Sequence, residues 1–329
     1  MEVPTEHMTF FPFHSYWWFY CGFTGLVLVF LLVDLGLFHR KAHKVGFREA
    51  TVWTVVWACL AVVFCLGLYR YIDSLHGAVI AKKLALEFMT GYVVEWSLSL
   101  DNMFVFVLVF RYFAIPPELQ HRVLFYGILG ALIFRAIFIA LGAALLRFEW
   151  VIFLFGGFLV FTGVKLVFSS ETEIDPEGNI LVRALRKVLP VTQTLEGQRF
   201  VVRRQRKLFA TPLLVTLVFV EATDILFAVD SVPAIFAITT EPLIVFTSNV
   251  FAILGLRAMY FLLAGAVELF HLLRYGLALI LIFVGIKMTF LNRVWGGHFP
   301  TGISLAFIVG VLAVTILLSL AFPKKPAAP

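Results

Sequence analysis

Charged side chains are scarce in this sequence. Asp, Glu, Lys and Arg together make up 14% of the 329 residues, whereas 61% are hydrophobic and the mean hydropathy is +0.98. Such a composition excludes an ordinary soluble domain and is typical of a chain with many membrane-spanning helices. The sequence therefore predicts an all-α integral membrane protein.

Cysteine is also rare, and its positions do not indicate a disulfide framework. The three cysteines, Cys21, Cys59 and Cys65, have no spacing typical of disulfide pairs or of a metal motif. We expect them to be small apolar residues in or beside membrane spans. The first residues are acidic and lack the basic region that precedes the apolar core of a cleaved signal peptide.

About nine apolar runs are long enough to cross a bilayer, which takes about 20 residues of helix. We expect them at 20–38, 51–68, 84–113, 123–146, 150–168, 213–238, 243–270, 275–291 and 303–322. The predicted organisation is two accessory spans, a three-helix unit, a connector, a second three-helix unit, and a last span with its tail, at 1–83, 84–168, 169–212, 213–291 and 292–329 respectively. The connector is expected to contain an amphipathic helix near 179–189 and a short hairpin in RFVVRRQRKLF.

Lys and Arg are distributed unevenly among the loops. Most of them lie in the loop after the first span, in the 169–212 connector and in the C-terminal tail, which share one side if there are nine spans. Because positive residues are retained on the cytoplasmic side, we expect an external N-terminus and a cytoplasmic C-terminus. The net charge of +6 is then a result of topology and of contact with anionic lipid, and it does not indicate nucleic-acid binding.

Two of the apolar helices nevertheless carry carboxylates in the middle of the span. These helices are VVEWSLSLDNMFVF, at 93–106, and VEATDILFAVDSVPAIF, at 220–236. A charge at the bilayer centre costs about 3 kcal/mol on insertion scales, so it is a functional candidate by default. The predicted site residues are Glu95, Asp101, Asn102, Glu221, Asp224, Asp230 and Ser231.

Both carboxylate helices begin three-helix units that resemble each other. Each helix has two acidic residues six positions apart, and each unit continues with one arginine and one lysine at matching places. The arginines and the lysines of the two units are both 122 positions apart, in the pairs Arg135 and Arg257, and Lys165 and Lys287. Because an odd number of helices separates the units, they would be inverted repeats, which in secondary transporters commonly enclose a site at the bilayer midplane.

Helical spacing divides the polar side chains between two faces. One face of each helix collects residues at i, i+4 and i+7, which are Glu95, Ser99 and Asn102 in the first and Asp224, Ala228 and Ser231 in the second. Asp101 and Asp230 are rotated from these faces by about 100°. We expect a local unwinding beside Pro233 to bring Asp230 toward the other ligands.

Every candidate ligand in these helices is an oxygen, and neither helix contains His or Cys. This counts against zinc, copper or iron–sulfur chemistry and favours a hard divalent cation such as Mn²⁺, Mg²⁺ or Ca²⁺, with no prosthetic group. Five carboxylates exceed their candidate counter-ions, Arg135 and Arg257, by three charges. Some carboxylates should therefore carry protons when no metal is bound, which predicts exchange of the cation for protons.

Other charged residues near span ends have either a structural or a gating interpretation. Asp34 and Glu268 lie close to predicted cytoplasmic ends, where both interpretations remain open. Lys165 and Lys287 are expected to extend along the helix to the interface.

Three long motifs carry a resemblance to a known family. EWSLSLDNMFVF, EATDILFAVDSVPAIFAIT and SNVFAILGLRAMYFLLAG resemble the TerC/Alx family of bacterial inner-membrane proteins, and the likeness extends from about residue 31 to the last span. The chain is more similar to the Alx-type branch than to the tellurite-operon branch. That family is associated with manganese export and, historically, with tellurite resistance. The resemblance implies an Mn²⁺ exporter and assigns functional roles to the same seven site residues.

Several other functions compete with transport of a cation. Tellurite is an oxyanion that would bind Arg and Lys, so direct tellurite transport is disfavoured, although a stress-resistance factor without flux stays open. An intramembrane aspartyl protease would use two aspartates, but its Gly-x-Gly-Asp sequence is absent here. A scaffold that assists metalation or secretion of partner proteins stays open, because the sequence cannot report flux. We expect a transporter and not an enzyme.

Overall fold

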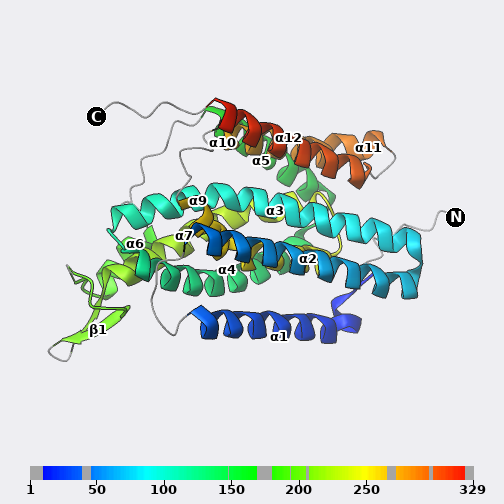
Figure 1. Cartoon of the computed structure of the whole chain (residues 1–329). Coiled ribbons are helices and arrows are strands. Elements are labelled where there is room, and N and C mark those ends of the chain that lie inside the picture. The colour runs from blue at the N-terminus through cyan, green and yellow to red at the C-terminus, as the bar shows by residue number, and fades with distance from the viewer. Residues whose placement is uncertain are drawn as a thin grey trace.

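The computed structural model describes residues 10–38, 46–146, 148–168, 180–192, 194–204, 207–264, 272–295 and 299–322 of the chain. The side chains of residues 34–38, 101, 104 and 149 lie outside this description. Long helices run side by side along one direction and form a single bundle (Figure 1).

Eight helices of the described residues are long and apolar enough to cross a membrane, and a bent pair makes up to nine. The eight are α1 (Phe13–Phe38), α2 (Phe47–His76), α3 (Ala78–Tyr112), α4 (Pro117–Leu145), α5 (Glu149–Phe168), α7 (Pro212–Phe236), α10 (Leu273–Ile286) with its extensions η2 (Lys287–Leu291) and α11 (Asn292–Val294), and α12 (Thr301–Ala321). The bent pair is α8 (Pro242–Leu254) and α9 (Leu256–Ala264). The predicted fold class is confirmed.

Proline and glycine set several of the helix boundaries. Pro117, Pro212 and Pro242 each occupy the first turn of a helix, where the missing N–H of proline has no helical partner to lose. Gly77 separates α2 from α3 with a φ of +85°, a conformation that glycine adopts without a steric penalty. The chain can therefore reverse direction within one residue at this point.

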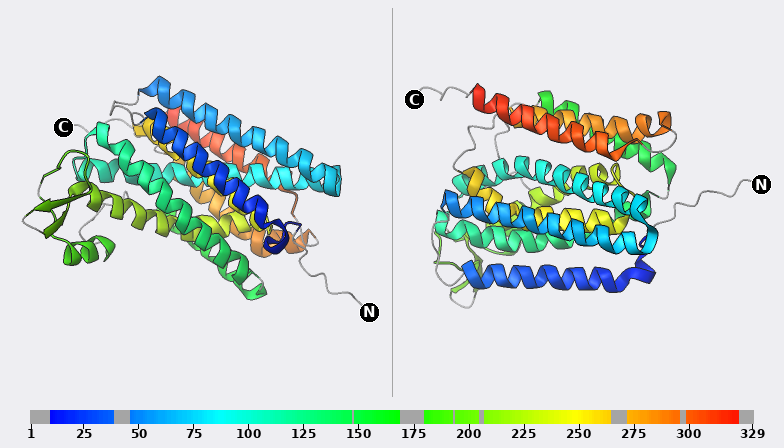
Figure 2. Two further views of the ribbon diagram at one scale, coloured as in Figure 1. Left: turned by 90° about the horizontal axis from the view of Figure 1, so that it is seen from below. Right: turned by 45° about the vertical axis from the view of Figure 1, so that its right-hand side comes forward.

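The third helix forms the centre of the bundle. α3 packs against α2, α7, α8, α9 and α12, while α5 lies along α10. Figure 2 shows α5, α10 and α12 together on one side of α3 and α1 on the opposite side. The α5–α10 approach depends on small residues, because a Cβ on Gly285 would lie 2.6 Å from the carbonyl oxygen of Gly156.

The helix contacts between the two predicted units form a pattern that is the same when the units are exchanged. α3 of the first unit packs against α8 of the second, and α4 packs against α7. Exchanging the units converts one of these contacts into the other, and it leaves the α3–α7 and α5–α10 contacts unchanged. These contacts are the ones that a twofold relation requires, while the inverted repeat itself stays a prediction.

The connector contains the two short elements that its sequence predicts. The amphipathic helix is α6 (Ile180–Val188), and the hairpin pairs β1 (Val201–Arg204) with β2 (Lys207–Ala210) in antiparallel register. Both elements lie together beyond one end of the bundle, at the left in Figure 1. Both expectations are confirmed.

The predicted unwinding beside Asp230 is wrong. α7 is continuous to Phe236, and Pro233 lies in its last turn, so the proline removes a hydrogen bond only near the helix end. The break occurs instead at Gly255, where α8 and α9 are bent by 41°. The expected extension of Lys287 to the interface is also wrong, because this side chain is 2% exposed and begins the π-helical segment η2.

Candidate cation site

Glu95 of α3 lies at the centre of a buried polar cluster. Its side chain is fully buried and forms an ion pair with Arg135 of α4. The other carboxylate oxygen accepts a hydrogen bond from Nδ2 of Asn249 of α8 at 3.1 Å. Arg135 Nη1 also donates to Oγ of Ser231 of α7 at 3.1 Å. Side chains from four helices, two from each predicted unit, therefore meet around one guanidinium and one carboxylate.

Two more carboxylates of α7 extend this cluster. Asp224 is 5% exposed and interacts electrostatically with both Arg135 and Glu95, while Glu221 interacts with Asp224 from one turn away. Oδ1 of Asp224 and Oε2 of Glu221 are buried and have no hydrogen-bond partner among the described residues. Such groups are costly in a protein interior, so these two oxygens are available acceptors for a proton or a cation.

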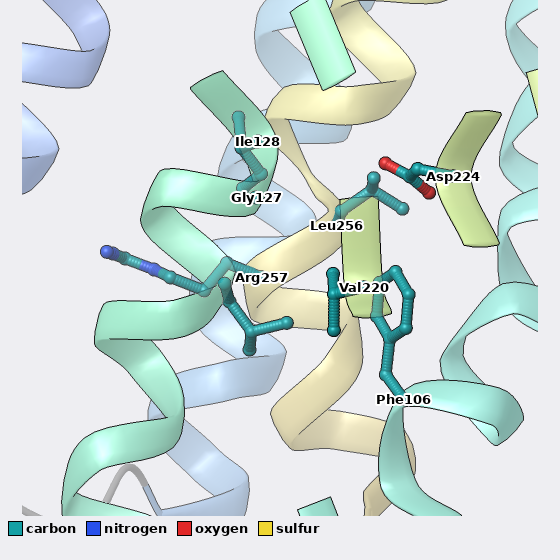
Figure 3. Close-up of a pocket in the computed structure, with 8 residues that line it drawn as sticks. Phe106, Gly127, Ile128, Val220, Asp224, Leu256 and Arg257 are labelled. Atoms are coloured by element: carbon teal, nitrogen blue, oxygen red, sulfur yellow. The ribbon is translucent and has the colours of Figure 1, made fainter. Parts of the chain in front are cut away.

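The formal charge of this cluster matches one divalent cation. Glu95, Glu221 and Asp224 supply three negative charges, and Arg135 supplies one positive charge, which leaves two negative charges when all four groups are ionised. Asp224 also lies at the edge of a small pocket between α3, α4, α7 and α9 (Figure 3). The pocket is lined by Phe106, Leu124, Gly127, Ile128, Val220, Asp224, Leu256 and Arg257.

The two intramembrane arginines are placed differently. Arg135 is 2% exposed and contacts the carboxylate cluster directly, whereas the guanidinium of Arg257 points away from Asp224 in Figure 3. The similar positions of the two arginines in sequence therefore do not give them the same surroundings. Of the two, Arg135 is the cation that neutralises the cluster.

The Glu221 carboxylate rests on a glycine of the neighbouring helix. A Cβ built on Gly130 of α4 would lie 2.0 Å from Oε1 and 2.3 Å from Cδ of Glu221. The absence of a side chain at Gly130 therefore creates the space that this carboxylate occupies.

Gly130→Ala is expected to displace the Glu221 carboxylate and to lower the affinity for a divalent cation about tenfold or more, a loss of roughly 1.4 kcal/mol. Gly157→Ala is the matched control, since it also replaces a glycine of a membrane helix but has no atom within 4 Å of its added Cβ. Titration of the detergent-solubilised proteins with Mn²⁺ checks this prediction. Equal affinities of the two variants would contradict it.

Asp230 does not join the central cluster. On α7 it faces α5, where its Oδ1 accepts a hydrogen bond from Thr162 Oγ1 at 3.3 Å and interacts electrostatically with Lys165. The rotation of about 100° deduced from helical spacing therefore persists in the fold, because α7 does not unwind. Asp230 and Asp224 have separate surroundings.

The remaining predicted site residues are described only in part. Asn102 is 3% exposed, next in sequence to Asp101, whose side chain lies outside the described part of the structure. The side chain of Asp34 and the whole of Glu268 also lie outside it. Among the residues that are described, no three His, Cys, Asp or Glu side chains are grouped as a metal site.

Sequence reasoning missed Asn249 as a member of the cluster. The signal was the polar run Thr247, Ser248 and Asn249 within an otherwise apolar helix, all three of which are fully buried. Thr247 and Ser248 donate to carbonyls of their own helix, which is the common structural role of such residues. Among the described residues, Asn249 has no local partner of this kind, and it contacts Glu95 instead.

Comparison with known proteins identifies the family. The model described as "Integral membrane protein TerC family" matches residues 80–327. The chain belongs to the TerC family. It is 50% identical over 92% of its length to a Myxococcus xanthus protein named "Uncharacterized membrane protein STKORF319", with 91% of that protein covered. It is also 47% identical to the "Putative membrane-bound redox modulator Alx" of Salmonella typhi and 46% identical to that of Escherichia coli K12, each over 91% of this chain and 92% of the relative.

The family match and the site coincide in sequence. All seven predicted site residues and both arginines lie between residues 80 and 327, whereas α1, α2 and the three cysteines precede the matched segment. No solved structure matches the chain. The TerC-family segment therefore contains the whole carboxylate cluster.

Proposed function

We propose that this TerC-family membrane protein exports a hard divalent cation, most simply Mn²⁺, in exchange for protons. The observation that supports the proposal is the cluster of Glu95, Asp224 and Glu221 on two helices, in which Arg135 pairs with Glu95 and interacts with Asp224, and Asp224 interacts with Glu221. Each buried ion pair costs desolvation energy, so a structural role alone gives no reason for an excess of acid at this depth.

The ligand chemistry selects the class of cation. The described side chains of the cluster offer carboxylate, amide and hydroxyl oxygens, from Glu95, Asp224, Asn249 and Ser231 among others. Mn²⁺, Mg²⁺ and Ca²⁺ bind such ligands, whereas softer metals favour thiolate or imidazole. Arg135 forms an ion pair with Glu95, so an arriving cation must displace its guanidinium from the carboxylate.

Proton exchange follows from the charge balance. When the metal leaves, Arg135 is the one positive charge counted against the three carboxylates, and protons can neutralise the two remaining negative charges. One divalent cation and up to two protons therefore compete for the same oxygens. This competition is the simplest way for the site to couple the two fluxes.

The proposed setting is the bacterial inner membrane with the N-terminus outside and the C-terminus cytoplasmic. It follows the uneven distribution of Lys and Arg, including the basic residues of α6 and of the β1–β2 hairpin. In this orientation α6 and the hairpin lie on the cytoplasmic side, together with the C-terminal end of α1 and the N-terminal end of α2.

Several relatives are named as redox modulators, but the thiols of this chain give little support for such a role. Cys21 and Cys59 are exposed and Cys65 is buried, all three are unpaired, and they lie in α1 and α2 before the TerC-family segment. A thiol-based redox function would therefore have to reside outside the part that defines the family. A scaffold that assists metalation of other proteins is the remaining alternative.

Flux measured with the purified protein tests the proposal. Proteoliposomes that contain the full chain are expected to move Mn²⁺, to move protons in the opposite direction, and to respond to an imposed pH gradient. Competition by Mg²⁺, Ca²⁺ and Zn²⁺ then ranks the ions, with the oxygen-binding metals expected to compete better than Zn²⁺. Absence of flux from folded protein would favour the scaffold, and Mn²⁺ flux that is insensitive to pH would contradict the coupling.

A further inference from the structure

A second buried polar cluster lies at the opposite end of α3 from its cytoplasmic terminus. Glu87 is 5% exposed, and its Oε2 accepts a hydrogen bond from Oγ1 of Thr239 at 2.6 Å. Glu87 also lies 3.9 Å from Nζ of Lys83 and interacts electrostatically with Lys287. These contacts join α3 to the turn between α7 and α8 and to the π-helical segment η2.

Glu241 connects the same turn to the start of the chain. Its backbone N–H donates to Thr239 Oγ1 at 3.2 Å, and its carboxylate accepts hydrogen bonds from the backbone N–H groups of Phe10, at 2.7 Å, and Phe11, at 3.4 Å. Phe11 is fully buried and contacts the rings of Tyr16 and His76. Burial raises the pKa of Glu241, and the two N–H donors oppose that effect.

The position of this cluster relates it to the central site. Glu87 precedes Glu95 by eight residues on α3, which is about 12 Å along a helix axis. The turn that carries Thr239 and Glu241 directly joins α7, which holds Asp224, to α8, which holds Asn249. Any displacement of this turn from α3 therefore moves the ends of both helices that build the central cluster.

Lys287 supplies a buried positive charge near Glu87. It is 2% exposed and interacts electrostatically with Glu87, whereas Arg135 pairs with Glu95 directly. Lys287 begins a π-helical segment, an irregularity that is frequent at functional sites. A buried ion pair gives little net stability, because an apolar replacement of both partners is often neutral or stabilising. Stability alone thus does not account for two buried carboxylates and a buried lysine at this end.

We propose that Glu87, Thr239, Glu241 and Lys287 form a gate that closes the outer end of the transport path. This outer gate rests on the proposed transport function. In the closed state Glu87 bonds Thr239 and faces Lys287, while Glu241 holds the Phe10–Phe11 segment over the turn. Opening separates α3 from the α7–α8 turn and exposes the central cluster to the outer solution.

Accessibility of a buried reporter thiol tests the gate without relying on flux. Ser99 is fully buried and lies one turn from Glu95 on α3, so Ser99→Cys, in the full chain with its three native cysteines replaced by alanine, reports access to the central cluster. A membrane-impermeant thiol reagent is added to the face that carries the N-terminus. The gate variants are Glu87→Gln, Lys287→Met and the double variant. The control is Lys82→Met, which removes an exposed lysine from α3, the helix that carries Glu87.

We expect the reporter to react at least about five times faster in Glu87→Gln and in Lys287→Met than in the Lys82→Met control. Thr239→Val removes only the hydroxyl and keeps every charge, so it gives the same comparison if a charge variant does not fold. Reaction rates equal to the control in all folded gate variants would overturn the gate. Parallel Mn²⁺ flux separates the two proposals: faster labelling without wild-type flux overturns transport and keeps a conformational gate, whereas flux with unchanged labelling overturns only the gate.

Discussion

Arg135→Met is expected to make the folded protein depend on a divalent cation. The substitution removes the guanidinium that pairs with the buried Glu95 and interacts with the buried Asp224, and removal of one partner of a buried ion pair typically costs about 3–5 kcal/mol of unfolding free energy. A cation bound to the same oxygens would restore stability, by about 2.7 kcal/mol at a concentration one hundred times its Kd. Thermal unfolding in detergent, with and without Mn²⁺, measures both effects.

Two variants serve as controls for this result. Arg122→Met lies on the same helix but removes an arginine whose side chain bonds Gln198 at an exposed site, so it should cost no more than about 1 kcal/mol and show no dependence on Mn²⁺. The double variant Glu95→Gln with Arg135→Met removes both partners and should regain much of the lost stability. If Arg135→Met unfolds at the wild-type temperature without metal, Arg135 is not the cation that neutralises the cluster.

Asp224→Asn and Asp230→Asn are expected to differ strongly in Mn²⁺ binding, although both change the same residue type on the same helix. Asp224 contributes an unpartnered buried oxygen beside Arg135 and Glu95, so its loss should weaken binding about thirtyfold or more, which is roughly 2 kcal/mol. Asp230 bonds Thr162 on α5 and should change the affinity less than about threefold. Titration calorimetry or the electron paramagnetic resonance signal of Mn²⁺ measures each affinity.

The two aspartates control for each other in this experiment. Equal losses in both variants would mean that the two carboxylates bind one ion together, which would require α7 to rotate or unwind beyond the arrangement in the structure. An unchanged affinity in Asp224→Asn would remove this residue from the site. Glu95→Gln should behave like Asp224→Asn, because Glu95 contacts both Arg135 and Asn249.

The family and the positions of the intramembrane carboxylates follow from local features of the sequence. The resemblance carried by three long motifs is confirmed by the TerC match, and the apolar runs predicted the spans to within a few residues at most ends. Helical spacing placed Glu95 and Ser99 on one buried face and Asp224 and Ser231 on another. A straight helix fixes these relations, so they need no knowledge of the neighbouring helices.

Irregularities in the helices were predicted poorly. Pro233 suggested an unwound segment in α7, but the helix continues because the proline lies in its last turn. The bend between α8 and α9 and the π-helical segment at Lys287 have weaker signals, a single glycine in one case and none in the other. Such departures depend on the packing of neighbouring helices, which local propensity does not contain.

The sequence by itself determined that this is a multi-span TerC-family membrane protein with several carboxylates and no His or Cys in the middle of two helices. Only the tertiary structure decided which acids meet: Glu95 with Asp224 around Arg135, Asp230 with Thr162, and Glu87 with Thr239 and Lys287. The physical reason is that helical periodicity acts within one helix, whereas contacts between acids depend on separate helices. Helical periodicity fixes the direction of a side chain about its own axis, whereas the identity of its partner depends on how separate helices cross and how closely small residues such as Gly130 let them approach.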